Sequence, residues 1–82
     1  MTLLETENGK IYRIREILGG RGFRTRLRTI GLHIGDLIER ISEGFGGPLL
    51  IKNISLNTKI AIGRGMAMKI IVEPVHEDSI GK

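Results

Sequence analysis

Glycine divides this chain into short apolar segments, and that division limits the fold more than any other feature. The chain has 12 glycines, which stand between groups of aliphatic residues, as at the pair Gly19 and Gly20 and again at Gly63. Glycine is one of the strongest signals for a turn, and no apolar group here approaches the roughly 18 consecutive residues of a membrane span. The pattern predicts one small, mostly β domain over residues 1–74, followed by a flexible tail over residues 75–82.

Five segments have the composition of β-strands. They cover residues 10–17, 37–43, 49–54, 58–62 and 68–73. Each is rich in β-branched or aromatic residues, which are favoured in strands. The last two segments alternate most clearly. We expect Ile60 and Ile62 on the core face of one, and Met68, Ile70 and Val72 on the core face of the other. Short strands with frequent turns favour a small barrel.

One segment has helical periodicity instead. Its apolar residues are Phe23, Leu27 and Ile30. Spacings of four and three residues place such side chains on one face of a helix, which predicts a helix over residues 21–30. Gly31 can adopt the left-handed conformation that ends a helix, and Leu32 would then pack against Leu27 in a Schellman motif. The predicted order is one strand, one short helix and four further strands.

The charge of the chain is unevenly distributed. The formal net charge is +4, and seven basic residues between positions 10 and 28 are accompanied by only one acidic residue, Glu16. Arg21, Arg24 and Arg28 lie on the side of the predicted helix away from its apolar stripe, and none has an acidic residue four positions later. Such a stripe is either a solvated outer face or a docking surface, because arginine binds carboxylates and phosphates well. Both readings stay open here.

The sequence offers little material for catalysis or tight metal binding. The chain has no cysteine, which excludes disulfides, thiolate metal sites and a cysteine nucleophile. The two histidines, His33 and His76, have no further ligand at a metal-binding spacing. The pair His33 and Asp36, expected in a loop, is a weak candidate for a metal site. We therefore predict no enzyme activity, no catalytic residue and no tightly bound cofactor.

Nucleic acid is a less favoured partner for the basic stripe. Small barrels that bind single strands use aromatic side chains as stacking platforms. The aromatic residues here are Tyr12, Phe23 and Phe45, and Phe23 is already assigned to the core. We therefore expect no nucleic-acid partner.

Several motifs occur in a characteristic order over roughly Leu3 to Pro74. The pair Gly19-Gly20 precedes the run Arg-Leu-Arg-Thr-Ile-Gly-Leu-His-Ile-Gly-Asp at 26–36, and Gly47-Pro48 and then Ile-Ala-Ile-Gly-Arg-Gly-Met-Ala at 60–67 follow it. In this order the motifs strongly resemble the FeoA family. The resemblance implies a small cytosolic SH3-like barrel with a helix after the first strand, which agrees with the order of elements read from the residues.

The resemblance also implies a function. FeoA proteins accompany FeoB, the bacterial membrane transporter of ferrous iron with a cytosolic GTPase domain, so we expect a cytoplasmic accessory or regulatory protein that acts by protein contact. The same barrel forms the last domain of iron-dependent repressors of the diphtheria-toxin-repressor type. The alternative is therefore a metal-sensing module that weakly binds ferrous iron or another divalent transition metal. Weak self-association also stays open.

We expect the partner-binding surface on the helix and the turn after it. Its expected residues are Arg21, Arg24, Arg28, Leu32 and His33. The residues given a structural role are Phe23, Leu27, Ile30, Gly31, Gly47 and Pro48. The start of the chain has neither the basic nor the apolar region of a secretion signal, so an unexported protein is expected.

Overall fold

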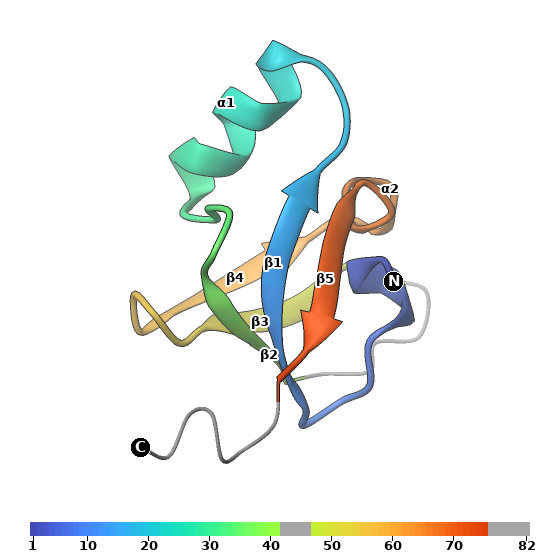
Figure 1. The fold of residues 1–82 in the computed structure, drawn as a ribbon, viewed down its shortest axis with the longest axis vertical. Helices are drawn as coiled ribbons and strands as arrows, with labels where there is room; N and C mark the ends of the chain where they lie inside the picture. Colours follow the sequence, from blue (N-terminus) through green and yellow to red (C-terminus); the bar gives the residue numbers. More distant parts are fainter. Residues whose placement is uncertain (42–46, 76–82) are drawn as a thin grey trace.

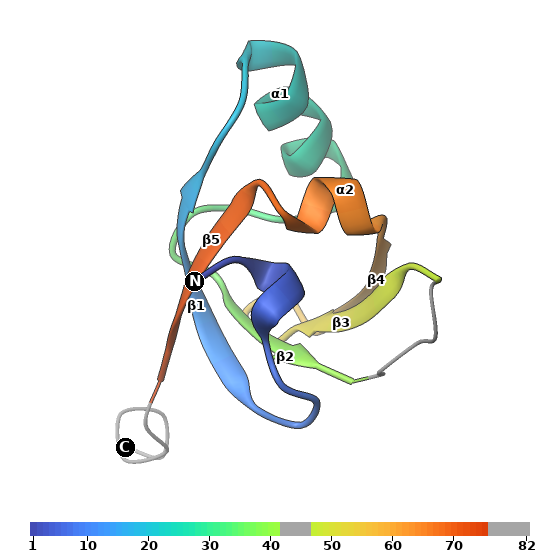
Figure 2. The ribbon, with the colours of Figure 1, turned by 90° about the vertical axis from the view of Figure 1, so that its right-hand side faces the viewer.

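Five antiparallel strands form one curved sheet in the order β4-β3-β2-β1-β5 (Figure 1). The computed structural model describes residues 1–41 and 47–75. The elements in chain order are η1 (Leu3–Glu5), β1 (Ile11–Ile17), α1 (Arg21–Ile30), β2 (Leu37–Arg40), β3 (Leu49–Asn53), β4 (Thr58–Ile62), α2 (Arg64–Ala67) and β5 (Ile70–Pro74). The sheet curves around η1 and α2 (Figure 2). This is the mostly β barrel with a helix after its first strand that the sequence predicts.

Strand β1 connects the two halves of the sheet. Its first residues pair with β2, and the strand continues along β5 as far as the pair Ile17 and Ile70. The register shifts between Ile14 and Glu16, which is a β-bulge. A bulge inserts one extra residue and turns the strand locally. Here it keeps Glu16 exposed while Ile14 and Ile17 are both buried, so the end of β1 still faces the core before the chain enters α1.

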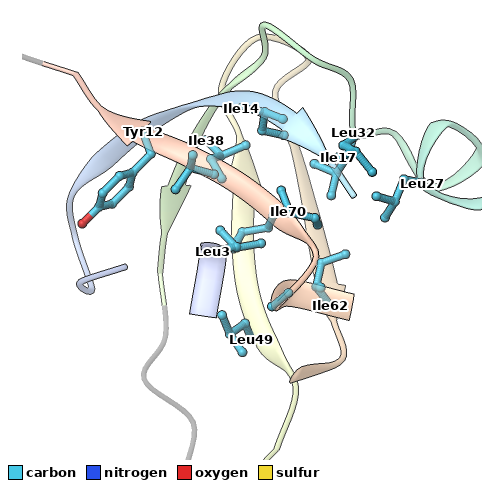
Figure 3. Close-up of a cluster of buried hydrophobic side chains, with 13 residues drawn as sticks. Leu3, Tyr12, Ile14, Ile17, Leu27, Leu32, Ile38, Leu49, Ile62 and Ile70 are labelled. Carbon is cyan, nitrogen blue, oxygen red and sulfur yellow. The ribbon is translucent and has the colours of Figure 1, made fainter. Parts of the chain in front are cut away.

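The core lies inside the curve of the sheet (Figure 3). Its buried apolar residues are Leu3, Tyr12, Ile14, Ile17, Leu27, Leu32, Ile38, Leu49, Ile51, Ile62, Ala67, Ile70 and Val72. The predicted core faces are confirmed at Ile62, Ile70 and Val72. The prediction for Met68 is wrong, because the chain forms the one-turn helix α2 before β5, and the side chain of Met68 is 57% exposed.

The N-terminal 3-10 helix η1 is an element that the sequence analysis missed. It places Leu3 in the core, fully buried. The backbone N–H of Thr2 donates to Glu5 Oε1 over 2.7 Å, and this hydrogen bond holds the pKa of Glu5 below its ordinary value. Thr2 also bridges to Ile71, so the start of the chain lies against the outer edge of β5.

Helix α1 has the predicted bounds and the predicted end. Gly31 adopts a left-handed conformation with φ of 101°. The Leu32 N–H donates to the Leu27 carbonyl over 2.9 Å, and the Gly31 N–H donates to the Arg28 carbonyl over 3.1 Å. These two bonds are those of a Schellman motif, and both leucines are buried. The motif predicted from the sequence is confirmed.

The apolar stripe of α1 is narrower than predicted. Leu27 is fully buried, Phe23 is half-buried, and Ile30 is 37% exposed. The reason is the position of α1, which stands at one end of the barrel and does not lie across the sheet (Figures 1 and 2). The Phe23 ring lies 5.2 Å from Lys69 Nζ, a cation–π contact. Ile30 is therefore not a core residue.

The predicted strand ends differ from the observed ends by one or two residues in three cases. β1 begins at 11, β3 ends at 53 and β5 covers 70–74, so its last residue is Pro74. β2 ends at 40, and the predicted residues 42 and 43 lie outside the described residues, as does the tail from residue 76. Gly47 and Pro48 lead directly into β3.

Replacing Leu27 by alanine should destabilise the fold by ~2 to 5 kcal/mol, because the substitution deletes fully buried side-chain volume. Denaturant unfolding followed by circular dichroism measures this loss. The matched control is Ile30→Ala on the same helix, where the exposed side chain should make the loss much smaller. Equal losses at the two positions would show that Leu27 is not the anchor of α1.

Replacing Gly31 by alanine should destabilise the fold by about 1 to 2 kcal/mol, because a left-handed conformation is costly for a residue with a Cβ. The added Cβ would meet Ile60 Cδ1 at 3.7 Å, an ordinary contact, so the cost arises from the backbone. Gly22→Ala is the control, since Gly22 lies within α1, has nothing within 4 Å of the added Cβ, and alanine is favoured over glycine in a helix. Thermal unfolding of both variants checks the difference, and an unchanged melting temperature for Gly31→Ala would contradict it.

Candidate functional site

The exposed side of α1 carries the basic stripe that the sequence analysis singled out. Arg21, Arg24 and Arg28 are all exposed. None of the ion pairs found among residues 1–41 and 47–75 includes an arginine of α1. Within the described part of the chain, the three guanidinium groups are therefore exposed and outside any ion pair.

Two of these arginines border a hollow at the junction of β1, α1 and the turn after α1. The hollow has a volume of about 270 Å³ and is lined by Ile17, Arg24, Arg28, Leu32, His33 and Ile34. Arg24 and Arg28 are one helical turn apart, so their side chains lie on the same side of α1. The junction therefore combines an apolar lining with two cationic groups, whereas Arg21 does not line it.

The turn after α1 is held by one carboxylate oxygen. Asp36 Oδ2 accepts hydrogen bonds from the His33 N–H over 2.9 Å and from Asn53 Nδ2 over 2.8 Å, and it lies 3.0 Å from His33 Nδ1. The Asp36 N–H donates back to the His33 carbonyl over 3.1 Å. Gly35, with φ of 96°, allows the chain to turn between them. Asp36 thus fixes the position of the His33 ring beside the hollow.

Asn53, at the end of β3, connects this turn to the end of α1. Its Nδ2 also donates to the Gly31 carbonyl over 2.8 Å, and its Oδ1 accepts from the Leu56 N–H over 3.2 Å. The side chain is fully buried. Buried polar groups are nearly always hydrogen-bonded, and in Asn53 both ends of the amide have partners. Sequence reasoning did not identify Asn53, because Gly31 and Asp36, the partners that connect it to the end of α1 and the following turn, are distant in the sequence.

Leu32 is buried, although the sequence predicted it as a residue of the partner-binding surface. Its side chain is 0% exposed and forms part of the core that lines the hollow. The Schellman motif explains this, since it packs the residue after the glycine back against the helix. The next apolar residue along the turn, Ile34, is 60% exposed at the hollow. Ile34 therefore takes the place at the surface that was expected for Leu32.

His33 and Asp36, the weak metal candidates, lie together as the sequence suggested, but within the turn. The Asp36 oxygen nearest the histidine already accepts bonds from two amide groups. No group of three or more histidine, cysteine, aspartate or glutamate side chains able to hold a metal ion occurs within residues 1–41 and 47–75. The pair has a clear structural role in this arrangement.

Among residues 1–41 and 47–75, no helix is both long enough and apolar enough to cross a bilayer.

The fold is shared with metal-dependent regulators of transcription. A manganese-dependent transcriptional repressor in complex with manganese superposes with a TM-score of 0.83 at 16% sequence identity. The match covers 92% of this chain and 36% of the repressor chain. At this identity the likeness concerns the fold alone.

Sequence and structure together identify the family. Residues 1–74 match the family model described as the FeoA domain. The protein assigned as Fe(2+) transport protein A in Methanocaldococcus jannaschii is 40% identical over 60 residues, which are 73% of this chain and 70% of that protein. The crystal structure of an iron uptake regulatory protein, FeoA, superposes with a TM-score of 0.83 at 29% identity and covers 92% of this chain and 97% of that chain. The chain therefore belongs to the FeoA family and has its SH3-like barrel fold.

Proposed function

We propose that this chain is a cytoplasmic accessory or regulatory protein of ferrous iron transport, which acts by contact with the FeoB membrane transporter and its GTPase domain. Membership of the FeoA family supports the role in iron transport. The observation that supports action by contact is the hollow beside α1, where Arg24 and Arg28 lie exposed next to apolar side chains.

This surface has the composition of a protein-binding site. Arginine is enriched at interfaces and at the few positions that contribute most of the binding energy. An arginine can bind a partner's carboxylate with two parallel hydrogen bonds, while the apolar lining accepts a side chain. The exposed Ile34 adds an apolar group at the edge. The contact residues we propose are Arg24, Arg28, His33 and Ile34, with Arg21 at the margin one turn earlier.

The role we propose is not catalytic. General acid–base catalysis requires a titratable side chain within reach of the reacting group. His33 and Asp36 are titratable groups beside the hollow, and the hydrogen bonds of Asp36 commit that pair to the turn. We therefore assign these two residues to the architecture of the docking surface.

The alternative function is direct sensing or binding of a metal. The barrel shared with the manganese-dependent repressor supports only a common fold, and no function follows from it at 16% identity. In this chain the nearest arrangement to a ligand pair, His33 with Asp36, supplies two groups that already hydrogen-bond within the turn. We accordingly place contact with the transporter first and weak ferrous iron binding second.

Reversing the charge of Arg24 and Arg28 to glutamate should weaken binding to the transporter roughly tenfold or more, about 1.4 kcal/mol, because attraction becomes repulsion. The fold should be unchanged, since both side chains are exposed. NMR titration of the labelled chain with the detergent-solubilised transporter, at low and high salt, measures the effect. The control is Lys59→Glu with Arg64→Glu, which makes the same charge change away from the hollow. Unchanged binding of the first variant would move the interface elsewhere.

Calorimetric titration with ferrous iron under anaerobic conditions should give no stoichiometric binding in the micromolar range, because a hard-to-borderline metal needs more ligands than one histidine and one engaged carboxylate. His33→Ala provides the comparison. Micromolar binding that His33→Ala removes would favour the metal-binding function over docking.

A further inference from the structure

The hollow beside α1 combines an apolar lining with positive charge, which suits an aliphatic side chain flanked by carboxylates. Its volume of about 270 Å³ falls below the ~300 to 1,000 Å³ of pockets for drug-sized ligands. Ile17, Leu32 and Ile34 supply the apolar lining, and Arg24 and Arg28 supply positive charge one helical turn apart. A peptide that presents an aliphatic residue and acidic residues within a few positions would satisfy both parts.

The chain itself contains such a peptide after β5. Residues 77–80 read Glu-Asp-Ser-Ile, and they belong to the segment 76–82 that lies outside the described residues. In an extended peptide, residues two positions apart lie on the same face. Asp78 and Ile80 would then share one face, whereas Glu77 would lie on the opposite face and add negative charge to the segment. The charge and the side-chain type both complement the hollow.

The direction of β5 separates this segment from the hollow of its own molecule. Ile70 pairs with Ile17 at the hollow, and Pro74 pairs with Tyr12 at the other end of β1. A tail that returned to its own hollow would have to reverse and then span the five residues from Tyr12 to Ile17, about 17 Å. A β-turn takes four residues, and the two that remain before Ile80 reach only about 7 Å.

We infer that the Glu77–Ile80 segment of one copy binds the hollow of a second copy, with Ile80 beside Ile17 and Ile34 and the Asp78 carboxylate on Arg24 and Arg28, while Glu77 adds to the electrostatic attraction. The inference goes beyond the proposed function and does not depend on it. A contact of this size lies far below the ~1,200 Å² of stable protein interfaces. The association is therefore weak, depends on protein concentration and decreases with salt.

A second copy bound in this way occupies the surface proposed for the transporter. Arg24 and Arg28 cannot bind two sets of carboxylates at once. One consequence rests on the proposed function: self-association would withhold the docking surface at high protein concentration, and the transporter would release the second copy. The weak self-association left open by the sequence acquires a specific site and a specific segment.

The test uses the 82-residue chain and two synthetic peptides. The labelled chain carries the tail changes Glu77→Lys, Asp78→Lys and Ile80→Ser, so that its own tail cannot compete. Titration with an unlabelled peptide of residues 75–82 should then shift the amide resonances of Ile17, Arg28, His33 and Ile34. The wild-type chain alone should show the same shifts as its concentration rises, and the tail-changed chain should not.

Reversing the charges of the hollow and of the peptide together distinguishes a loss of binding from a loss of folding. Arg24→Glu and Arg28→Glu in a chain whose only tail change is Ile80→Ser should abolish the shifts. A peptide with Glu77→Lys and Asp78→Lys should bind this reversed chain, whose own acidic tail cannot compete, and should not bind the chain that keeps both arginines. Lys59→Glu with Arg64→Glu should leave binding unaltered. Absence of shifts at the hollow, or shifts that survive the arginine reversal, would overturn the inference. Differences between wild type and tail variant that do not change with concentration would instead show contact within one molecule.

Discussion

The side chain of Asn53 holds the end of α1 and the turn after it to the barrel. Its amide nitrogen donates both to the carbonyl of Gly31, at the end of α1, and to the carboxylate of Asp36, in the following turn. The group is fully buried, so loss of either partner would leave a desolvated donor, which costs about 1 to 3 kcal/mol. Because Gly31 and Asp36 bracket residues 32–35, this one side chain sets where Leu32, His33 and Ile34 lie. The hollow exists only while that segment keeps its place relative to β1.

Helix α1 contributes little to the core and much to the surface. Of its residues only Leu27 is buried, and the Schellman motif adds Leu32 from the turn beyond it. The β-bulge in β1 brings Ile17 to the same point, so that Figure 3 shows these three side chains together at one end of the core. An element anchored at one end can carry several like charges without disturbing the barrel. This arrangement explains why basic residues can gather on α1.

The parts of the fold that depend on local interactions could be predicted from the sequence. The bounds of α1, the left-handed Gly31 and the strand 58–62 follow from periodicity and from the conformational freedom of one glycine. Met68 and Ile30 were misplaced because tertiary packing decided them: α2 delays β5, and α1 stands at the end of the barrel. The predicted exposure of Leu32 was wrong for a different reason. A leucine that closes a Schellman motif is packed against its helix, so the motif and an exposed contact role for Leu32 were incompatible from the start.

The hollow itself could not be predicted, because it joins Ile17 to residues 24–34 through the curvature of the sheet. The sequence indicated the arginines but not the apolar lining beside them. That lining affects how strongly the arginines can attract carboxylates. Exposed charges alone contribute little to binding in water. Beside an apolar recess, a bound side chain excludes water from the guanidinium groups and strengthens their attraction for carboxylates. The specificity of this surface therefore lies in the combination, and a partner that offers acidic residues without an aliphatic one, or the reverse, would gain only part of the binding energy.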